Sequence, residues 1–214
     1  KKYVINSMLQ RLKKRKLKHF GYAVVAYHAA DTTYNGKSIE QINLMKGRKH
    51  KARYEAETVI DIMIAGGASA VFHGMGEEDV KRIMQYPFNM FASDASIRVL
   101  NAGMPHPRGY GTNARVLGKY VREEKVITLE EAIRRMTSLP AQKFQLSDRG
   151  ILKEGMAADI VIFDEKEVKD MATFEKPHAY SKGFHYVIVN GVITAENEKH
   201  LGVRAGKALY HISQ

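Results

Sequence analysis

The chain of 214 residues carries a formal net charge of +11 at pH 7, with 44% hydrophobic residues, 27% charged residues and no cysteine. This composition is typical of a globular chain with one sizeable core, and it excludes a disulfide framework and a thiolate metal site. No secretory signal and no run of about eighteen apolar residues occur, so we expect no membrane span and a cytoplasmic location. Because the first residue is Lys1 rather than Met, we expect the native N-terminus to be absent.

The positive charge is concentrated at the start of the chain. Eight lysines and arginines precede His19 without an acidic residue among them, which leaves a net charge of only about +3 for the remainder. Such a run can bind nucleic acid. Leucines within residues 5–18 predict a weakly amphipathic helix, however, and no aromatic side chains are interleaved. We therefore favour a helix with solvated basic faces and expect no nucleic-acid partner.

The first half of the chain alternates apolar runs of strand length with stretches of helical spacing. Strands are expected over residues 21–27, 68–72 and 90–92. Helices are expected over residues 5–18, 38–45, 56–64 and 77–86. Two of the strands end at a histidine, His28 and His73. Strands that alternate with helices predict parallel βαβ units.

The second half follows a different pattern. Helices are expected over residues 114–121 and 128–136, with a short one from Ser138. A strand over residues 158–164 and a hairpin over residues 186–194, turning at Asn190-Gly191, follow. We therefore expect a barrel-like part over residues 1–150 and a small β part over residues 151–214.

Asp94 directly follows the strand expected at residues 90–92. A loop rich in proline and glycine comes next and contains His106 and Arg108. A carboxylate at a strand end, followed by such a loop, is how a (β/α) barrel builds its chemistry. Aspartates at strand ends also commonly form turns, so the pattern alone leaves both a catalytic and a turn-capping Asp94 open.

Several motifs occur in a fixed order. They are Ser93-Asp94, His106-Pro107-Arg108-Gly109-Tyr110-Gly111-Thr112, the glycine-led strand Gly155-Met156-Ala157-Ala158-Asp159-Ile160-Val161, and Val189-Asn190-Gly191. From about Phe20 onward the chain resembles the C-terminal half of the metal-dependent amidohydrolase superfamily. Within it, the His-Pro-Arg loop is similar to that of the N-acyl-D-amino-acid deacylases, or D-aminoacylases. The resemblance implies an α/β fold: the C-terminal part of a (β/α)8 TIM-like barrel followed by a small β-sandwich portion.

The resemblance also implies a hydrolase. Its substrate is an N-acyl-D-amino acid, whose amide bond is cleaved to a D-amino acid and a carboxylate with the help of zinc, Zn2+. Asp94 matches the metal-site aspartate that takes a proton from water and passes it to the leaving amine. Arg108 would bind the α-carboxylate of the substrate through its guanidinium fork.

One feature of the family is missing from this chain. The zinc ligands of the family lie largely on earlier barrel strands, and no His-x-His motif occurs here. We expect the remaining ligands from an N-terminal half of the barrel, either a second chain or a missing segment. The isolated chain should accordingly be inactive and bind zinc weakly. His73, His106 and His28 are further pocket candidates, although a structural role is the commoner one for each.

Three other interpretations stay open at this stage. The chain can belong to another amidohydrolase, one that opens cyclic amides or cleaves peptides. It can be a non-catalytic half-barrel, kept as a fragment or as a structural subunit. It can also be a binding module that uses its basic N-terminal residues.

Overall fold

Among the three α-helices of the N-terminal region, α2 begins at a side-chain cap and the other two have none. A computed structural model describes residues 1–97 and 99–209. Its first elements are α1 (Lys2–Lys14), β1 (Ala23–Tyr27), the short 3-10 helix η1 (Thr32–Tyr34), α2 (Ile39–Met45), α3 (Ala52–Ile64) and β2 (Ser69–Phe72). Ser38 caps α2: its Oγ accepts the Gln41 N–H at 3.1 Å, and Gln41 Oε1 accepts the Ser38 N–H at 2.8 Å. This reciprocal cap confirms the predicted start of α2.

The remaining elements follow in chain order. They are α4 (Glu77–Met84), α5 (Arg108–Arg115), the π-helix η2 (Val116–Glu123), α6 (Leu129–Met136), α7 (Ser138–Lys143), β3 (Ile160–Phe163), β4 (Phe184–Val189), β5 (Val192–Glu196) and β6 (Lys199–His200). The chain packs as two compact units. The first comprises Lys1–Met75, Ile97–His106 and Phe174–His178, and the second comprises Gly76–Ser96, Pro107–Thr173 and the segment that begins at Ala179. These units do not test the boundary predicted near residue 150, which stays a prediction.

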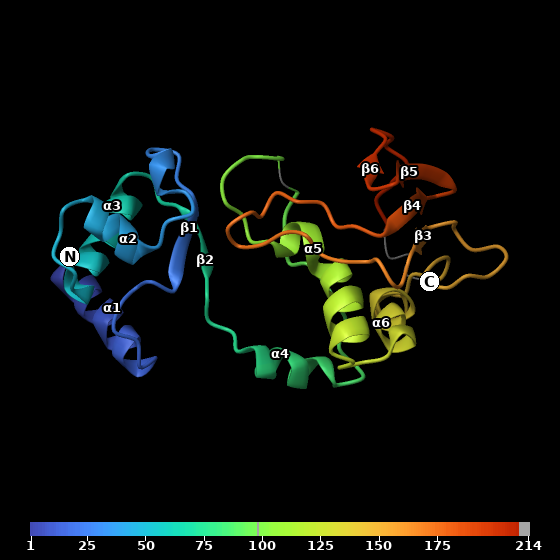
Figure 1. The fold of residues 1–214 in the computed structure, drawn as a ribbon, viewed down its shortest axis with the longest axis horizontal. Coiled ribbons are helices and arrows are strands. Elements are labelled where there is room, and N and C mark those ends of the chain that lie inside the picture. The colour runs from blue at the N-terminus through green and yellow to red at the C-terminus, as the bar shows by residue number, and fades with distance from the viewer. Residues whose placement is uncertain (98, 210–214) are drawn as a thin grey trace. The chain divides into compact units, whose positions relative to one another are not determined.

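The core of the first unit lies between its three helices and β1. In Figure 1 the helices α1, α2 and α3 lie together on one side of the paired strands β1 and β2. Apolar side chains from each helix are buried there: Ile5 and Leu12 from α1, Ile39 and Ile42 from α2, Ala56 and Ile62 from α3. The apolar stripe of α1 is therefore core, and its basic residues are left on the exposed side, as the amphipathic pattern predicts.

The pairing of β1 with β2 differs from the prediction. The two strands run antiparallel, with Val24 opposite Val71, rather than parallel. They form a two-stranded sheet, and the barrel is not closed among the described residues. A parallel sheet is stable when neighbouring strands and helices bury both of its faces, which a pair of strands cannot supply. The predicted parallel βαβ arrangement is thus wrong for this pair.

The prediction of a strand at residues 90–92 is also wrong. These residues have no strand partner in the described chain, and the Phe91 N–H instead donates to the Arg135 carbonyl at 3.4 Å, at the end of α6. Asp94 consequently lies in an irregular segment and not at a strand end. Its φ of +46° is in the left-handed region, which aspartate tolerates better than most residues.

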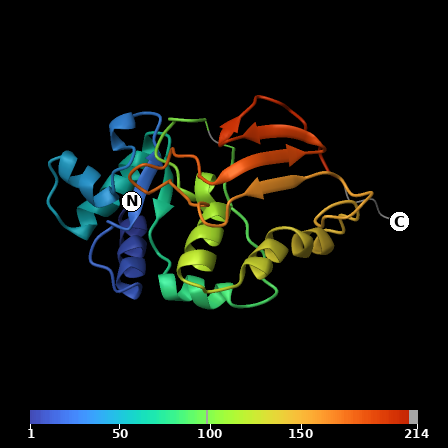
Figure 2. The same cartoon turned by 45° about the vertical axis from the view of Figure 1, so that its right-hand side comes forward.

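The second unit contains a helical layer and a small sheet. Its core is formed by η2 and by residues of α4, α5 and α6, among them Met84, Ala114, Tyr120 and Ala132. The strands β3, β4, β5 and β6 form an antiparallel sheet in sequence order, drawn in orange and red in Figure 2. Asn190 and Gly191, with φ of +48° and +81°, make the turn between β4 and β5. The predicted hairpin at Asn190-Gly191 is confirmed.

Candidate functional site

The structure brings together the two residues with the most specific predicted roles. Asp94 Oδ2 lies 2.7 Å from Arg108 Nη2, which is a salt bridge within the second unit. The Asp94 side chain is 85% exposed and that of Arg108 is 43% exposed, so both groups are within reach of a solute. An exposed pair of this kind contributes little to stability, about 0–1 kcal/mol. The pair therefore contributes little to holding the fold together.

Local structure fixes the position of Arg108. It is the first residue of α5, directly after Pro107, whose φ of −56° suits the start of a helix. The Arg108 carbonyl accepts the Thr112 hydroxyl at 2.8 Å, within the same helix. The N-terminus of a helix attracts negative charge, which favours Asp94 and any other carboxylate at this point.

His73 and His106 lie elsewhere, in the first unit, around one aromatic ring. The His73 ring is 4.5 Å from that of Phe174, and the His106 ring meets Phe174 edge-on at 5.0 Å. His73 and Phe174 also line a cavity of about 380 Å³, together with residues such as Lys37, Met104 and Glu175. The predicted pocket role of His73 stays a prediction.

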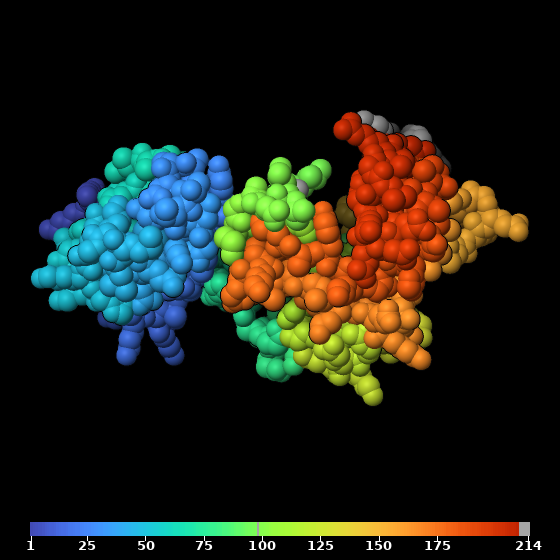
Figure 3. Space-filling view, turned by 45° about the horizontal axis from the view of Figure 1, so that its top comes forward, coloured from blue at the N-terminus to red at the C-terminus, as the bar shows by residue number. Residues whose placement is uncertain are grey.

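The segment that carries Phe174 is held against the loop that carries Met104. His178 Nε2 lies 2.9 Å from the Gly103 carbonyl oxygen. Figure 3 shows the corresponding orange residues 174–178 lying against the green residues 99–106. Part of the cavity wall is therefore built from two segments that are distant in sequence.

His28 is a structural residue in this chain. Its side chain is buried, its Nδ1 lies 2.8 Å from the Gly67 carbonyl, and its ring stacks on Tyr34 with centroids 5.6 Å apart. The backbone N–H of His28 donates to Asn35 Oδ1 at 2.9 Å. These contacts fix the ends of β1 and α3 and leave the imidazole inside the protein, so they support the structural alternative for this residue.

Asp94 alone does not make a zinc site. A catalytic zinc takes three protein ligands as a rule. Among the described residues, the one group of three or more ligating side chains close enough to share an ion is His19, Glu40, His50 and Glu55, and it does not include Asp94. The residues present near Asp94 therefore do not fit a zinc ion by themselves.

The cluster of His19, Glu40, His50 and Glu55 was missed by the sequence analysis. Its members come from four separate segments of the first unit: the α1–β1 loop, α2, the α2–α3 loop and α3. No spacing motif links them, and His19 lies at the edge of the region that resembled no known family. The packing of α2 against α3 is what creates the cluster.

The Amidohydrolase family matches residues 24–195 of the chain. The chain belongs to the amidohydrolase family. It is 43% identical over 140 residues to the N-acyl-D-glutamate deacylase of Alcaligenes xylosoxydans xylosoxydans, covering 65% of this chain and 28% of that protein. It is 34% identical over 207 residues to the D-aminoacylase of the same organism, covering 97% of this chain and 40% of that protein. The chain thus spans less than half the length of either relative.

Solved structures give the same relationship. A crystal structure of D-aminoacylase matches with a TM-score of 0.76 at 34% identity, over 89% of this chain and 38% of that one. N-acyl-D-glutamate deacylase from Bordetella bronchiseptica, in complex with zinc and a phosphonate inhibitor, matches with a TM-score of 0.72 at 33% identity, over 87% and 38%. The chain is thus a mixed α/β fragment related to D-aminoacylase, and the resemblance noted in the sequence is confirmed.

No helix within residues 1–97 and 99–209 combines the length and the apolar character that a membrane crossing needs.

Proposed function

We propose that this chain is the C-terminal part of an N-acyl-D-amino-acid deacylase, which hydrolyses an amide bond to give a D-amino acid and a carboxylate. In this proposal residues 1–150 complete a (β/α)8 barrel and residues 151–214 belong to a small β-sandwich. An N-terminal half, in the same polypeptide or in a second one, supplies the other barrel strands.

The observation that carries the proposal is the Asp94–Arg108 pair. In our proposal Asp94 is the proton-accepting carboxylate and Arg108 the carboxylate-binding guanidinium, and in the folded chain the two side chains lie 2.7 Å apart. The relatives support the substrate class, because N-acyl-D-glutamate deacylase and D-aminoacylase are both named for the hydrolysis of acylated D-amino acids. A small substrate with one carboxylate and one amide bond can contact Arg108 and Asp94 at the same time when these two side chains are neighbours.

The two residues have different tasks in the reaction. Asp94 accepts the proton of the attacking water and delivers it to the nitrogen of the leaving amine. Arg108 binds the α-carboxylate with two parallel N–H donors and so fixes the amide relative to Asp94. Zinc, when bound, activates water and polarises the amide carbonyl. In our proposal its ligands lie mainly in the N-terminal half.

The pair also suggests how substrate binding prepares the site. In the structure one guanidinium nitrogen of Arg108 contacts Asp94, and the group has further N–H donors for an incoming α-carboxylate. In our proposal the substrate carboxylate competes with Asp94 for the guanidinium and weakens the contact between the two residues. The substrate thereby helps to place the base.

The experiment is to complete the chain and assay its substrate class. The N-terminal part of the Alcaligenes D-aminoacylase, up to the point where its match to this chain begins, is joined to or co-expressed with residues 1–214. Amino-acid release is then measured from N-acetyl-D- and N-acetyl-L-amino acids, and ring opening from dihydroorotate. We expect hydrolysis of the D substrates and none by the 214-residue chain alone. A completed protein that folds and binds zinc but opens only the cyclic amide, or cleaves nothing, would overturn the proposal.

A further inference from the structure

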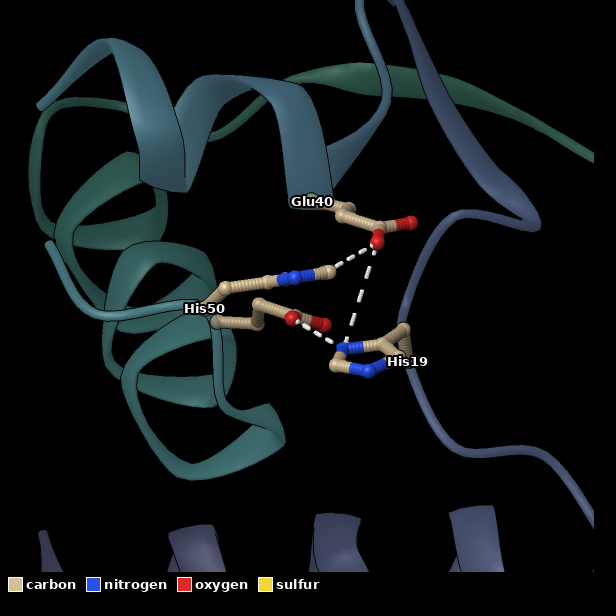
Figure 4. Close-up of side chains that lie close together, drawn as sticks. His19, Glu40 and His50 are labelled. Atoms are coloured by element: carbon tan, nitrogen blue, oxygen red, sulfur yellow. Dashed lines mark hydrogen bonds and ion pairs between the residues drawn. The ribbon is translucent and has the colours of Figure 1, made fainter.

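Four potential metal ligands meet on one side of the first unit. They are His19, Glu40, His50 and Glu55, and one ligand atom from each lies within 4.8 Å of those of the other three. Figure 4 shows His19, Glu40 and His50 converging, with His19 and His50 both linked to the Glu40 carboxylate. The roles that the family resemblance assigns fall on other positions of the chain.

The contacts in the cluster already aim the ligand atoms at a shared point. His19 Nδ1 lies 2.6 Å from Glu55 Oε1 and 4.0 Å from Glu40 Oε1. His50 Nε2 contacts the same Glu40 oxygen. The two imidazole rings are stacked, with centroids 4.1 Å apart and planes inclined by 25°. Each histidine thus turns one ring nitrogen toward the carboxylates.

The innermost ligand is held in place by the backbone. Glu55 has a fully buried side chain, and its Oε2 accepts the Phe20 N–H at 2.7 Å. That bond fixes the carboxylate and leaves Oε1 turned toward His19, which is how outer partners orient the ligands of a metal. Because Phe20 directly follows His19, the same stretch of the α1–β1 loop positions His19 and holds the Glu55 carboxylate.

Charge and exposure favour a divalent cation. A buried carboxylate needs compensation, and two carboxylates beside each other repel unless a positive charge lies between them. A divalent ion neutralises both. The side chains of Glu40, His19 and His50 are 28%, 31% and 50% exposed, so an ion can enter from the solvent side while Glu55 forms the floor.

We propose that His19, Glu40, His50 and Glu55 form a binding site for one zinc ion. Two imidazole nitrogens and two carboxylate oxygens are a donor set that suits zinc in tetrahedral coordination. Ligand atoms around a tetrahedral zinc lie about 3.3–3.6 Å apart, from bond lengths of about 2.0–2.2 Å. In the structure His19–Glu55, at 2.6 Å, and His50–Glu40 are closer than this, and the other ligand atoms are up to 4.8 Å apart. Side-chain rotations that separate these two pairs and draw the remaining atoms together give the spacing that zinc needs. The sequence predicts weak zinc binding because Asp94 is the only family metal position in this chain. That prediction does not take His19, Glu40, His50 and Glu55 into account.

With four protein ligands the site is structural rather than catalytic. A closed coordination shell leaves no position for water or substrate. The ion ties the α1–β1 loop to α2, to the α2–α3 loop and to α3, and both of these helices contribute side chains to the core of the first unit. Zinc should therefore stabilise that unit by binding the folded state alone.

The test is zinc titration of the complete 214-residue chain, purified in the presence of a chelator and then freed of it, in competition with a chromophoric zinc indicator. We expect one zinc per chain. His50→Gln and Glu40→Gln change exposed side chains, so both variants should fold, and both should lose zinc affinity by more than the roughly 10- to 100-fold that loss of an outer partner causes. Zinc should raise the melting temperature of the unmodified chain but not of these two variants.

Two control variants separate this site from others. His185→Gln removes an exposed histidine on β4, and Asp94→Asn alters the carboxylate proposed for catalysis. Both should bind zinc as the unmodified chain does. The proposal is overturned if the chain takes up no stoichiometric zinc, if His50→Gln and Glu40→Gln bind it unchanged, or if Asp94→Asn is the variant that loses it. Because catalysis is not measured, failure here leaves the proposed deacylase function unaffected.

Discussion

At the scale of single residues, the proposed chemistry depends on Asp94 and Arg108 being neighbours. The sequence placed both in one loop region but did not show that they touch. In the structure Asp94 is in an irregular segment after α4 and Arg108 begins α5, and a salt bridge of 2.7 Å joins them. In our proposal the two side chains act on the same substrate, so the pair links binding to catalysis.

Substitution of Arg108 tests its role as the binding group for the substrate carboxylate. In the completed enzyme, Arg108→Lys keeps the charge but loses the two-pronged geometry, so we expect a clearly raised KM for an N-acyl-D-amino acid. Arg108→Ala should weaken substrate binding further, on the order of 2–5 kcal/mol if the ion pair with substrate is buried. The measurement is steady-state kinetics on a matched acid and amide.

The preference for the acid over the amide gives the sharper readout. Both Arg108 variants should discriminate poorly between the two substrates, because the group that senses the carboxylate is altered. Arg82→Ala, an exposed arginine on α4, serves as the control and should keep the preference. An acid-over-amide preference that survives Arg108→Ala would show that another residue binds the carboxylate.

At the scale of elements, local signals in the sequence succeeded and long-range ones failed. The caps at Ser38 and Thr128 and the turn at Asn190-Gly191 were predictable because each depends on a few adjacent residues. The strand at residues 90–92 and the parallel pairing of β1 with β2 were not, because strand formation depends on partners that local sequence does not specify. His28 shows the same limit: its partner, the Gly67 carbonyl, lies 39 residues away.

The helix α6 contains a charged network whose strength depends on pH. Glu131 accepts hydrogen bonds from Arg134 at 2.8 Å and from Arg135 at 2.7 Å, and Arg135 is buried. These bonds, from Arg134 first and then Arg135, lower the pKa of Glu131 from its ordinary value of 4.5 to about 2. A pKa that is lower in the folded state stabilises the fold above the unfolded value and loses that effect as the pH falls. The network should weaken between pH 4.5 and about 2.

We predict that Glu131→Gln lowers the melting temperature at neutral pH, because it removes the negative charge beside two arginines. The variant should also lose less stability than the unmodified chain as the pH falls from 4.5 toward 2. Thermal melts across this range measure both effects. Glu154→Gln, in an exposed turn, should follow the unmodified chain at every pH. Equal acid sensitivity in Glu131→Gln and the unmodified chain would exclude Glu131 as the titrating group.

At the scale of the whole molecule, the chain matches part of longer relatives. The match to D-aminoacylase covers 97% of this chain but only 40% of that protein. Composition and periodicity predicted an α/β chain with a small β part, and the motif order identified the family. The absence of the His-x-His motif from the sequence indicated that the zinc site needs residues from elsewhere. The cluster around Glu55 could not be foreseen, because it exists only once α2 and α3 have packed.

The most direct test of this account is the turnover of the completed enzyme with Asp94 and with Asp94→Asn. General acid–base catalysis contributes about 10²–10⁴-fold, so the substitution should lower kcat on an N-acyl-D-amino acid by that factor. The fold should be kept, as circular dichroism would show, and so should the zinc held by the N-terminal half, as metal analysis would show. Turnover within about tenfold of the unmodified enzyme would contradict the account, because the base would then lie elsewhere.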